Sequence, residues 1–130
     1  MQIFNTMSRQ KEEFVPQTPG EYRIYVCGPT VYNYIHIGNA RPMIVFDTLR
    51  RYLEYCGNKV YYVSNITDID DKLIKKGQEE GTSMQEVARK FEAEYIKDSD
   101  GLNVKAPTVR PSATEQIGEI IHIVKNLLDS

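Results

Sequence analysis

The residues of this chain best suited to chemistry lie between Cys27 and Asn39, in the sequence CGPTVYNYIHIGN. His36 and Asn39 offer short hydrogen-bond donors, and Gly38 between them has no Cβ that would keep a ligand away. A helix is predicted to follow, and the first N–H groups of a helix favour anionic ligands such as phosphates. The arrangement indicates a nucleotide site.

Two strands and one helix are predicted to position this cluster. β-forming residues predict a strand at about residues 22–27 and another at 60–64. Between them, apolar residues at helical spacing from about Met43 predict a helix that Gly57 ends. Its predicted apolar face consists of Phe46, Leu49, Leu53 and Cys56. A strand–helix–strand unit of this kind makes a right-handed crossover between parallel strands, so the fold class is α/β.

The carboxyl ends of the two parallel strands are predicted to meet at one crevice, where open α/β sheets bind their ligands. This geometry brings Cys27 and His36 near residues 65–68. Acidic residues also follow the second strand, at Asp68, Asp70 and Asp71. Their spacing lacks the glycine and the distal glutamate of a calcium loop, so they are better explained as residues that favour a helix start.

The rest of the chain is predicted to be mainly helical. Capping boxes, in which a hydroxyl and a carboxylate satisfy free N–H groups, are predicted at Thr67, Ser83 and Ser112. Two apolar stripes at helical spacing are Met84, Val87, Ala88, Phe91 and Tyr95, and Ile117, Ile120, Ile121, Val124, Leu127 and Leu128. Residues 1–20 are predicted to be a lead-in segment that ends in a turn.

Several blocks of this sequence resemble one known family. His36-Ile37-Gly38-Asn39 is similar to the HIGH motif of class I aminoacyl-tRNA synthetases, and residues 26–41 resemble its form in the cysteinyl-tRNA synthetases. Residues 65–72 are similar to the segment after the second strand of that family, and residues 3–12 resemble its opening. The resemblance implies a Rossmann-like catalytic domain, of which residues 1–130 are expected to form the first half, with parallel strands and flanking helices.

The resemblance implies ATP-dependent activation of L-cysteine to cysteinyl-adenylate, followed by transfer to tRNA(Cys), with Mg²⁺ accompanying ATP. His36 and Asn39 match the catalytic donors of the family, which stabilise charge on the phosphate oxygens. The positions that match ATP contacts are Gly28, Thr30, His36, Gly38 and Asn39. Cys27, Gly28 and Thr67 match contacts to the amino acid. Thr67 is equally well explained as a helix cap, and the two roles are compatible.

The resemblance also makes Cys27 one ligand of a Zn²⁺ ion that binds the substrate thiolate. Soft Zn²⁺ prefers a thiolate to a hydroxyl, so it excludes serine where a hydrophobic pocket discriminates poorly. The other ligands of the family lie far downstream, and neither Cys56 nor His122 is a credible substitute. We therefore expect no tight zinc in this chain alone. The simpler alternative for Cys27 is a small core residue.

Size and composition agree with one domain of a cytoplasmic protein. The 130 residues, 41% of them hydrophobic, can bury one core. The net charge of −2 does not show the excess of basic residues that is typical of nucleic-acid-binding domains. No run is long enough to span a membrane, and the amino terminus lacks an apolar signal block. We expect a monomer when the protein is intact. The chain lacks the Lys-rich KMSKS-type loop and the anticodon-binding region of the family that it resembles. We therefore expect an amino-terminal piece of a longer enzyme, with a naturally shortened relative as the alternative.

Other functions remain open from the sequence. A related ligase couples the cysteinyl adenylate to an amino sugar instead of to tRNA. The carboxyl-terminal region that would distinguish the two acceptors is missing from the present sequence. Nucleotidyltransferases carry HIGH-like motifs, but Cys27 and the block around Thr67 argue against them. A non-catalytic fragment that binds a nucleotide or a partner through an uncovered sheet is the alternative from a different class. Five basic residues could meet nucleic acid, although a solvated helix face explains them better: Arg50, Arg51, Lys72, Lys75 and Lys76.

Overall fold

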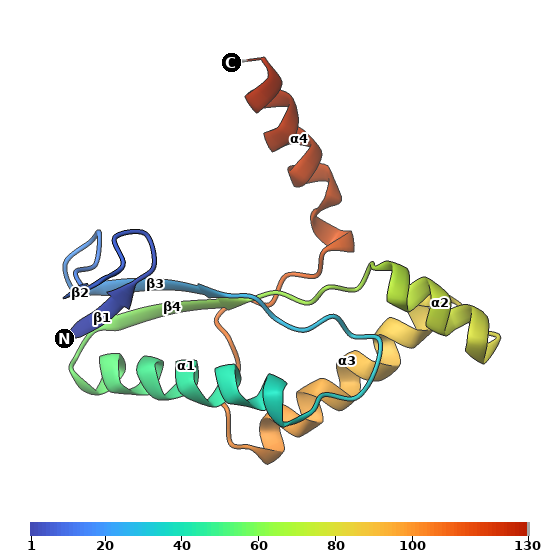
Figure 1. The fold of residues 1–130 in the computed structure, drawn as a ribbon, viewed down its shortest axis with the longest axis horizontal. Coiled ribbons are helices and arrows are strands. Elements are labelled where there is room, and N and C mark those ends of the chain that lie inside the picture. Colours follow the sequence, from blue (N-terminus) through green and yellow to red (C-terminus); the bar gives the residue numbers. More distant parts are fainter. Residues whose placement is uncertain (130) are drawn as a thin grey trace.

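A parallel pair of strands lies at the centre of the computed structural model, which describes residues 1–129 (Figure 1). β3 (Glu21–Val26) and β4 (Lys59–Ser64) are paired with Glu21 opposite Lys59 and Val26 opposite Ser64. α1 (Ile37–Tyr55) connects them and packs along one face. The predicted α/β unit with parallel strands is therefore confirmed, and both strands end at the same edge.

Side-chain alternation decides which strand residues face α1. Tyr22, Ile24 and Val26 turn toward the helix and pack in a cluster with the buried residues Leu53, Val60 and Tyr62. The intervening residues Arg23, Tyr25, Tyr61 and Val63 line a hollow on the opposite face. Figure 1 shows α1 and α3 on one side of the strands and α4 rising on the other.

α1 begins at Ile37, well before the start that we expected near Met43. The residues of the motif itself form the cap, with His36 at the N-cap and Asn39 completing a reciprocal capping box. This first turn contains no apolar stripe, and Pro42 lies inside the helix. Hydrophobic periodicity therefore could not reveal it, because the helix start is held by polar contacts.

A second core joins the loop after β3 to α2 (Asp71–Glu80) and α3 (Met84–Gly101). Val31, Ile66 and Leu73 are almost fully buried in it, together with most of the predicted α3 stripe: Val87, Ala88, Phe91 and Tyr95. That stripe is confirmed, with Met84 packed against the cluster as a partly buried residue.

Only one of the three predicted capping boxes forms. Ser83 accepts from the Glu86 backbone N–H while the Glu86 carboxylate accepts from the Ser83 backbone, as predicted. The box at Thr67 is wrong, because Asp70 caps α2 and accepts from the Lys72 N–H at 2.9 Å. The box at Ser112 is also wrong, since the following helices have no side-chain cap.

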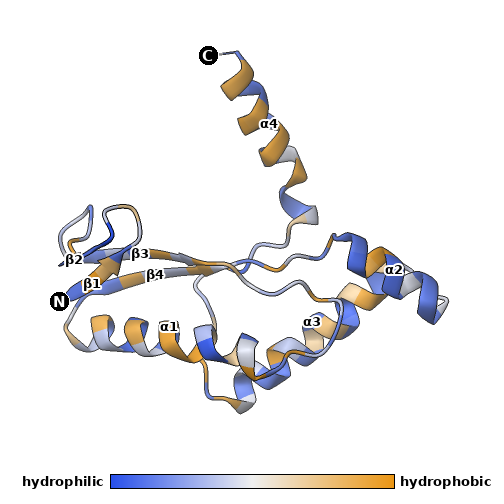
Figure 2. Ribbon diagram, in the orientation of Figure 1, coloured by the Kyte–Doolittle hydropathy of each residue, from blue (hydrophilic) through white to orange (hydrophobic). Residues whose placement is uncertain are grey.

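The chain returns beside β4 before its last helices. Val109 and Ser112 form isolated parallel bridges with Val63 and Ile66, so this segment extends the sheet beyond β4. η1 (Thr114–Gln116) and α4 (Ile117–Leu128) follow. The apolar stripe of α4 forms on one helix as predicted but packs against no core, and its residues are exposed (Figure 2).

The amino-terminal segment holds a hairpin that the sequence did not reveal. β1 (Gln2–Asn5) and β2 (Gln10–Glu13) pair antiparallel, and Arg9 near the turn has a positive φ of 57°. The strand Gln10–Glu13 is wholly polar and exposed, so it lacks the alternation that marks a strand. No helix within residues 1–129 is long and apolar enough to cross a membrane.

Candidate nucleotide site

The segments after the two strands are joined by backbone hydrogen bonds. Thr67 N–H donates to the Pro29 carbonyl at 3.1 Å, and Val31 N–H donates to the Thr67 carbonyl at 3.2 Å. The Gly28 N–H donates to Asn65 Oδ1 at 2.8 Å. The structure thus brings Cys27 and its neighbours to residues 65–67, as predicted from the parallel strands.

Gly28 lies against the chain that follows β4. A Cβ at this position would stand 1.6 Å from the backbone carbonyl oxygen of Asn65, closer than any side chain can tolerate. The sequence singled out Gly28 as a ligand contact. The structure adds a second reason for glycine, since the two strand ends approach each other through this residue.

Thr67 contributes mainly its backbone to this junction. It forms a parallel bridge with Thr30, while its hydroxyl lies 3.4 Å from the Asn65 side-chain amide. The helix-cap interpretation of Thr67 is therefore wrong. Its contact to the amino acid stays a prediction, and the bridge places it next to Thr30.

His36 is held in one orientation by its role as the helix cap. Its Nδ1 accepts a hydrogen bond from the Gly38 N–H at 3.0 Å, so the neutral ring carries its proton on Nε2. Asn39 uses its side-chain oxygen to accept from the His36 N–H at 3.1 Å. Both residues consequently keep a donor for a ligand: Nε2–H on His36 and the Nδ2 amide on Asn39. An acceptor-rich anion suits this pair.

A hollow of about 310 Å³ opens in front of these donors. It brings together Thr30, His36 and Asn39, three of the residues predicted to contact ATP. Its wall also contains Lys72, which we had placed on a solvated helix face. The other lining residues are Pro29, Tyr32, Asn33, Tyr34 and Ile35. Spacing along the chain gave no signal for Lys72, because it reaches the hollow from another element, α2.

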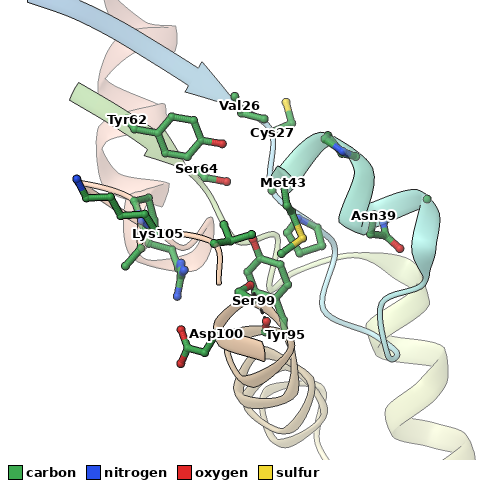
Figure 3. Close-up of a pocket in the computed structure, with 18 residues that line it drawn as sticks. Val26, Cys27, Asn39, Met43, Tyr62, Ser64, Tyr95, Ser99, Asp100 and Lys105 are labelled. Carbon is green, nitrogen blue, oxygen red and sulfur yellow. Dashed lines mark hydrogen bonds between the residues drawn. The ribbon is translucent and has the colours of Figure 1, made fainter. Parts of the chain in front are cut away.

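A second, smaller cavity of about 120 Å³ lies between the strands, the start of α1 and the end of α3. Cys27, Gly28, Gly38 and Asn39 are among its lining residues, together with Arg110. Figure 3 shows the Cys27 thiol pointing away from the other labelled side chains. Asn39 lines both cavities, whereas Thr30 and His36 line only the larger hollow.

Arg110 and Lys105 are the cationic residues that line the smaller cavity. The Arg110 guanidinium lies over the Tyr95 ring at 5.6 Å from the centroid, and its buried Nε has no hydrogen-bond partner within residues 1–129. The cation–π contact with the Tyr95 ring partly offsets the energetic cost of desolvating the Arg110 guanidinium.

Cys27 continues the alternation of β3 onto the face away from α1. It is exposed, and it neighbours Tyr25, whose pKa is raised above its usual value by partial burial and by the nearby Cys27 thiol. The alternative of a small core cysteine is not supported by this exposure. Cys56 is also exposed, at the C-cap of α1, so its expected place on the apolar face of the helix is wrong.

The residues present do not complete a metal site. Within residues 1–129 no group of three His, Cys, Asp or Glu side chains could hold a metal ion. Cys27 supplies one soft donor, whereas Zn²⁺ sites in proteins take three or four protein ligands. His122 lies on α4 beside Asn126, with 3.1 Å between its Nε2 and the amide nitrogen.

The acidic residues after β4 serve the local fold. Asp70 caps α2, and Asp68 accepts hydrogen bonds from both the backbone N–H and the hydroxyl of Thr114. The interpretation of these carboxylates as structural residues agrees with these contacts.

Comparison with known proteins gives a consistent assignment. Residues 13–130 match the family model for the class I (C) tRNA synthetase catalytic domain. Proteins named cysteine–tRNA ligase from Lachnospira eligens and Clostridioides difficile are each 59% identical to this chain over 99% of its length. One from Lachnoclostridium phytofermentans is 56% identical over the same share. The chain spans only 27–28% of the length of these relatives. Since the family match extends over nearly all of its residues, the chain belongs to the family of class I (C) tRNA synthetase catalytic domains.

Proposed function

We propose that residues 1–130 form the amino-terminal part of the Rossmann-like catalytic domain of a cysteine–tRNA ligase, and that they supply the HIGH-motif half of its active site. The observation that supports this most directly is the pair of oriented donors at the start of α1, His36 Nε2 and Asn39 Nδ2. The names of the relatives support the same function. They do not favour the alternative acceptor, an amino sugar.

In the proposed reaction, a carboxylate oxygen of L-cysteine attacks the α-phosphorus of ATP and the bond to pyrophosphate breaks. The product, cysteinyl-adenylate, then passes its aminoacyl group to tRNA(Cys). The site lowers the barrier mainly by positioning and by donating hydrogen bonds to phosphate oxygens. His36 and Asn39 supply these donors. We assign Thr30, Gly28 and Gly38 to the nucleotide; Thr30 lines the larger hollow and the two glycines line the smaller cavity. Mg²⁺ bound with ATP would offset part of the charge on the triphosphate.

We place the amino acid beside Cys27, Gly28 and Thr67, at the junction of the two strand ends. Zn²⁺, when bound, supplies preference for a thiolate over a hydroxyl. Cys27 is the one residue of this chain that we propose as its ligand. We further propose that the intact protein is a cytoplasmic monomer.

The test is cysteine-dependent exchange of pyrophosphate into ATP. The chain is measured alone and as a fused ligase, in which it replaces the corresponding segment of a 59%-identical relative. We expect exchange by the fused ligase with cysteine and not with serine, and none by the chain alone. A folded fused ligase without exchange, beside an active relative, would contradict the proposed function. Exchange by the chain alone would show that the downstream ligands and loop are unnecessary.

His36→Ala in the fused ligase tests the assignment of the donor. We expect adenylate formation to fall while the fold is retained, because His36 is exposed and packs in no core. Unchanged kinetics of cysteine activation would show that His36 does not act as a donor in the site.

A further inference from the structure

We propose that Lys72 binds the triphosphate of ATP and is the cationic residue of this site on the α2 side. The inference rests on the proposed function and extends it to a residue that lies outside the HIGH motif. It is carried by the position of the Lys72 side chain, by its lack of an ion-pair partner and by the charge of the hollow that it lines.

Lys72 belongs to the first turn of α2 and reaches a hollow whose other polar residues come from the loop before α1 and from α1 itself. Its ammonium lies 5.1 Å from the centre of the Tyr32 ring, a cation–π contact that keeps the side chain at the wall of the hollow. Tyr32 is itself packed against the core of α2 and α3. Two elements far apart in sequence thus bring a positive charge to the same hollow as His36 and Asn39.

The ammonium of Lys72 has no carboxylate partner within residues 1–129. The other lysines of α2 differ in this respect. Lys75 lies 4.0 Å from Glu79, and Lys76 lies 3.1 Å from Glu80. Asp70, the nearest capping carboxylate, accepts from the Lys72 backbone N–H. Lys72 is therefore the lysine of this helix that is available to a ligand.

The charge of the hollow favours Lys72 as a contact to a triphosphate. Lys72 is the only Lys or Arg among the lining residues, and no Asp or Glu is among them. His36 is neutral in the cap geometry, and Asn39 and Thr30 carry no charge. Neutral donors hydrogen-bond phosphate oxygens but do not balance their charge. Hydrogen bonds between charged groups are roughly twice as strong as neutral ones, so one ammonium adds substantially to binding.

The same contact also favours the reaction. As the bond to the α-phosphorus breaks, negative charge increases on the departing pyrophosphate. An ammonium directed at that group stabilises the transition state without taking part in proton transfer. We therefore expect Lys72 to affect the kinetics of ATP and pyrophosphate and to leave cysteine binding almost unchanged.

The test compares Lys72→Met with Lys75→Met in the fused ligase by ATP–pyrophosphate exchange. Methionine keeps an unbranched apolar stem and removes the charge. We expect Lys72→Met to raise KM for ATP at least about tenfold, as loss of one hydrogen bond to a charged group does. KM for cysteine should change less than about twofold, and Lys75→Met should match the wild type because that residue lies outside the hollow. Lys72→Arg should recover part of the loss.

Salt provides a second readout that a purely structural role would not change. KM for ATP should rise with ionic strength less steeply in Lys72→Met than in the wild type, because one screened attraction is gone. Circular dichroism and thermal melting confirm that both variants fold. Equal kinetics of the two variants, in a wild type with cysteine-dependent exchange, would overturn the role of Lys72 and leave the proposed function standing. A wild-type fused ligase without exchange would overturn both.

Discussion

His36 combines a structural and a chemical task in one ring. One nitrogen accepts a hydrogen bond that caps α1, which fixes the tautomer and leaves the other nitrogen as a donor. Gly38 makes this possible, because its N–H is the group that donates to the ring. The folding of the first helical turn and the orientation of the proposed catalytic donor are therefore the same event.

Gly38→Ala tests this coupling. A Cβ at Gly38 would stand 2.7 Å from Cε1 and 2.9 Å from Nδ1 of His36, so the ring must move. We expect kcat/KM for ATP in the exchange assay to fall about tenfold, the loss of roughly one hydrogen bond. Thermal stability should change little, because the helix propensity gained with alanine and the cap weakened by the ring movement are of similar size. Gly118→Ala is the control, since its Cβ meets no atom within 4 Å. Unaltered ATP kinetics in Gly38→Ala would show that the ring orientation is irrelevant.

Gly28→Ala belongs to the same scale but acts on the fold. The added Cβ would collide with the Asn65 backbone, which is fixed by the pairing of Thr67 with residues 29–31. We expect the free energy of unfolding to fall by about 1–3 kcal/mol, as overpacking does in other proteins. Gly101→Ala has open space around its Cβ and serves as the control in urea denaturation. Equal midpoints for the two variants would contradict the close approach.

At the scale of elements, the helix starts show that a capping pattern needs confirmation by geometry. The boxes at Ser83 and Ser112 look alike in sequence. Ser83 forms its cap by accepting from the Glu86 N–H at 3.2 Å, whereas the helices after Ser112 have no side-chain cap. Ser83→Ala should lower the free energy of unfolding by about 1 kcal/mol, the usual cost of losing an N-cap. Ser112→Ala should cost clearly less. Denaturant titration of both variants measures the difference, and equal losses would refute it.

The carboxylate of the same box makes α3 sensitive to acid. Hydrogen bonds from Thr82 and from the backbone and hydroxyl of Ser83 lower the pKa of Glu86 from 4.5 to about 2. A depressed pKa in the folded state means that the stabilising contribution is complete above about pH 4.5 and is lost as the pH falls toward 2. The Tm of Glu86→Ala should therefore lie below that of the wild type at pH 6, and the gap should close between pH 4.5 and 2.

Glu92→Ala on the same helix controls for removal of any carboxylate, since Glu92 caps no helix. A gap between Glu86→Ala and the wild type that is independent of pH would show that the charge of Glu86 does not support the cap.

At the scale of the whole molecule, two arginines of α1 hold the segment that returns after α3. Arg50 is buried, donates to the Ala106 carbonyl at 2.6 Å and pairs with Glu54. Arg51, which is half exposed, donates to the Asn103 carbonyl at 2.9 Å. These contacts fix residues 103–106 against α1 and so form one wall of the smaller cavity.

Arg50→Met should destabilise the protein more than Arg51→Met. Removing Arg50 leaves the partly buried Ala106 carbonyl without its side-chain donor, which costs about 1–3 kcal/mol, while Glu54 keeps its contact to Lys105. Exposed ion pairs contribute about 0.2–1 kcal/mol. Urea denaturation of both variants tests this order. Equal effects would mean that burial of Arg50 does not matter for the attachment of residues 103–106.

The sequence by itself determined the strand–helix–strand unit, the apolar stripe of α3, the box at Ser83 and the meeting of the two strand ends near Cys27. These features follow from local periodicity, from caps read within a few residues, or from the rule that parallel strands end at one edge. The family resemblance supplied the expected chemistry of His36 and Asn39, which periodicity does not encode.

Only the tertiary structure decided which groups share one hollow. The start of α1 at Ile37 depends on a reciprocal polar cap. Thr67 forms a parallel bridge with Thr30 and caps no helix. Lys72 lines the same hollow as His36 because Tyr32 and α2 pack on a common core. The bridge and the hollow join residues distant in sequence, whose distances are fixed only when the core closes. The cap of α1 is local, but it is made of polar contacts that leave no hydrophobic periodicity in the sequence.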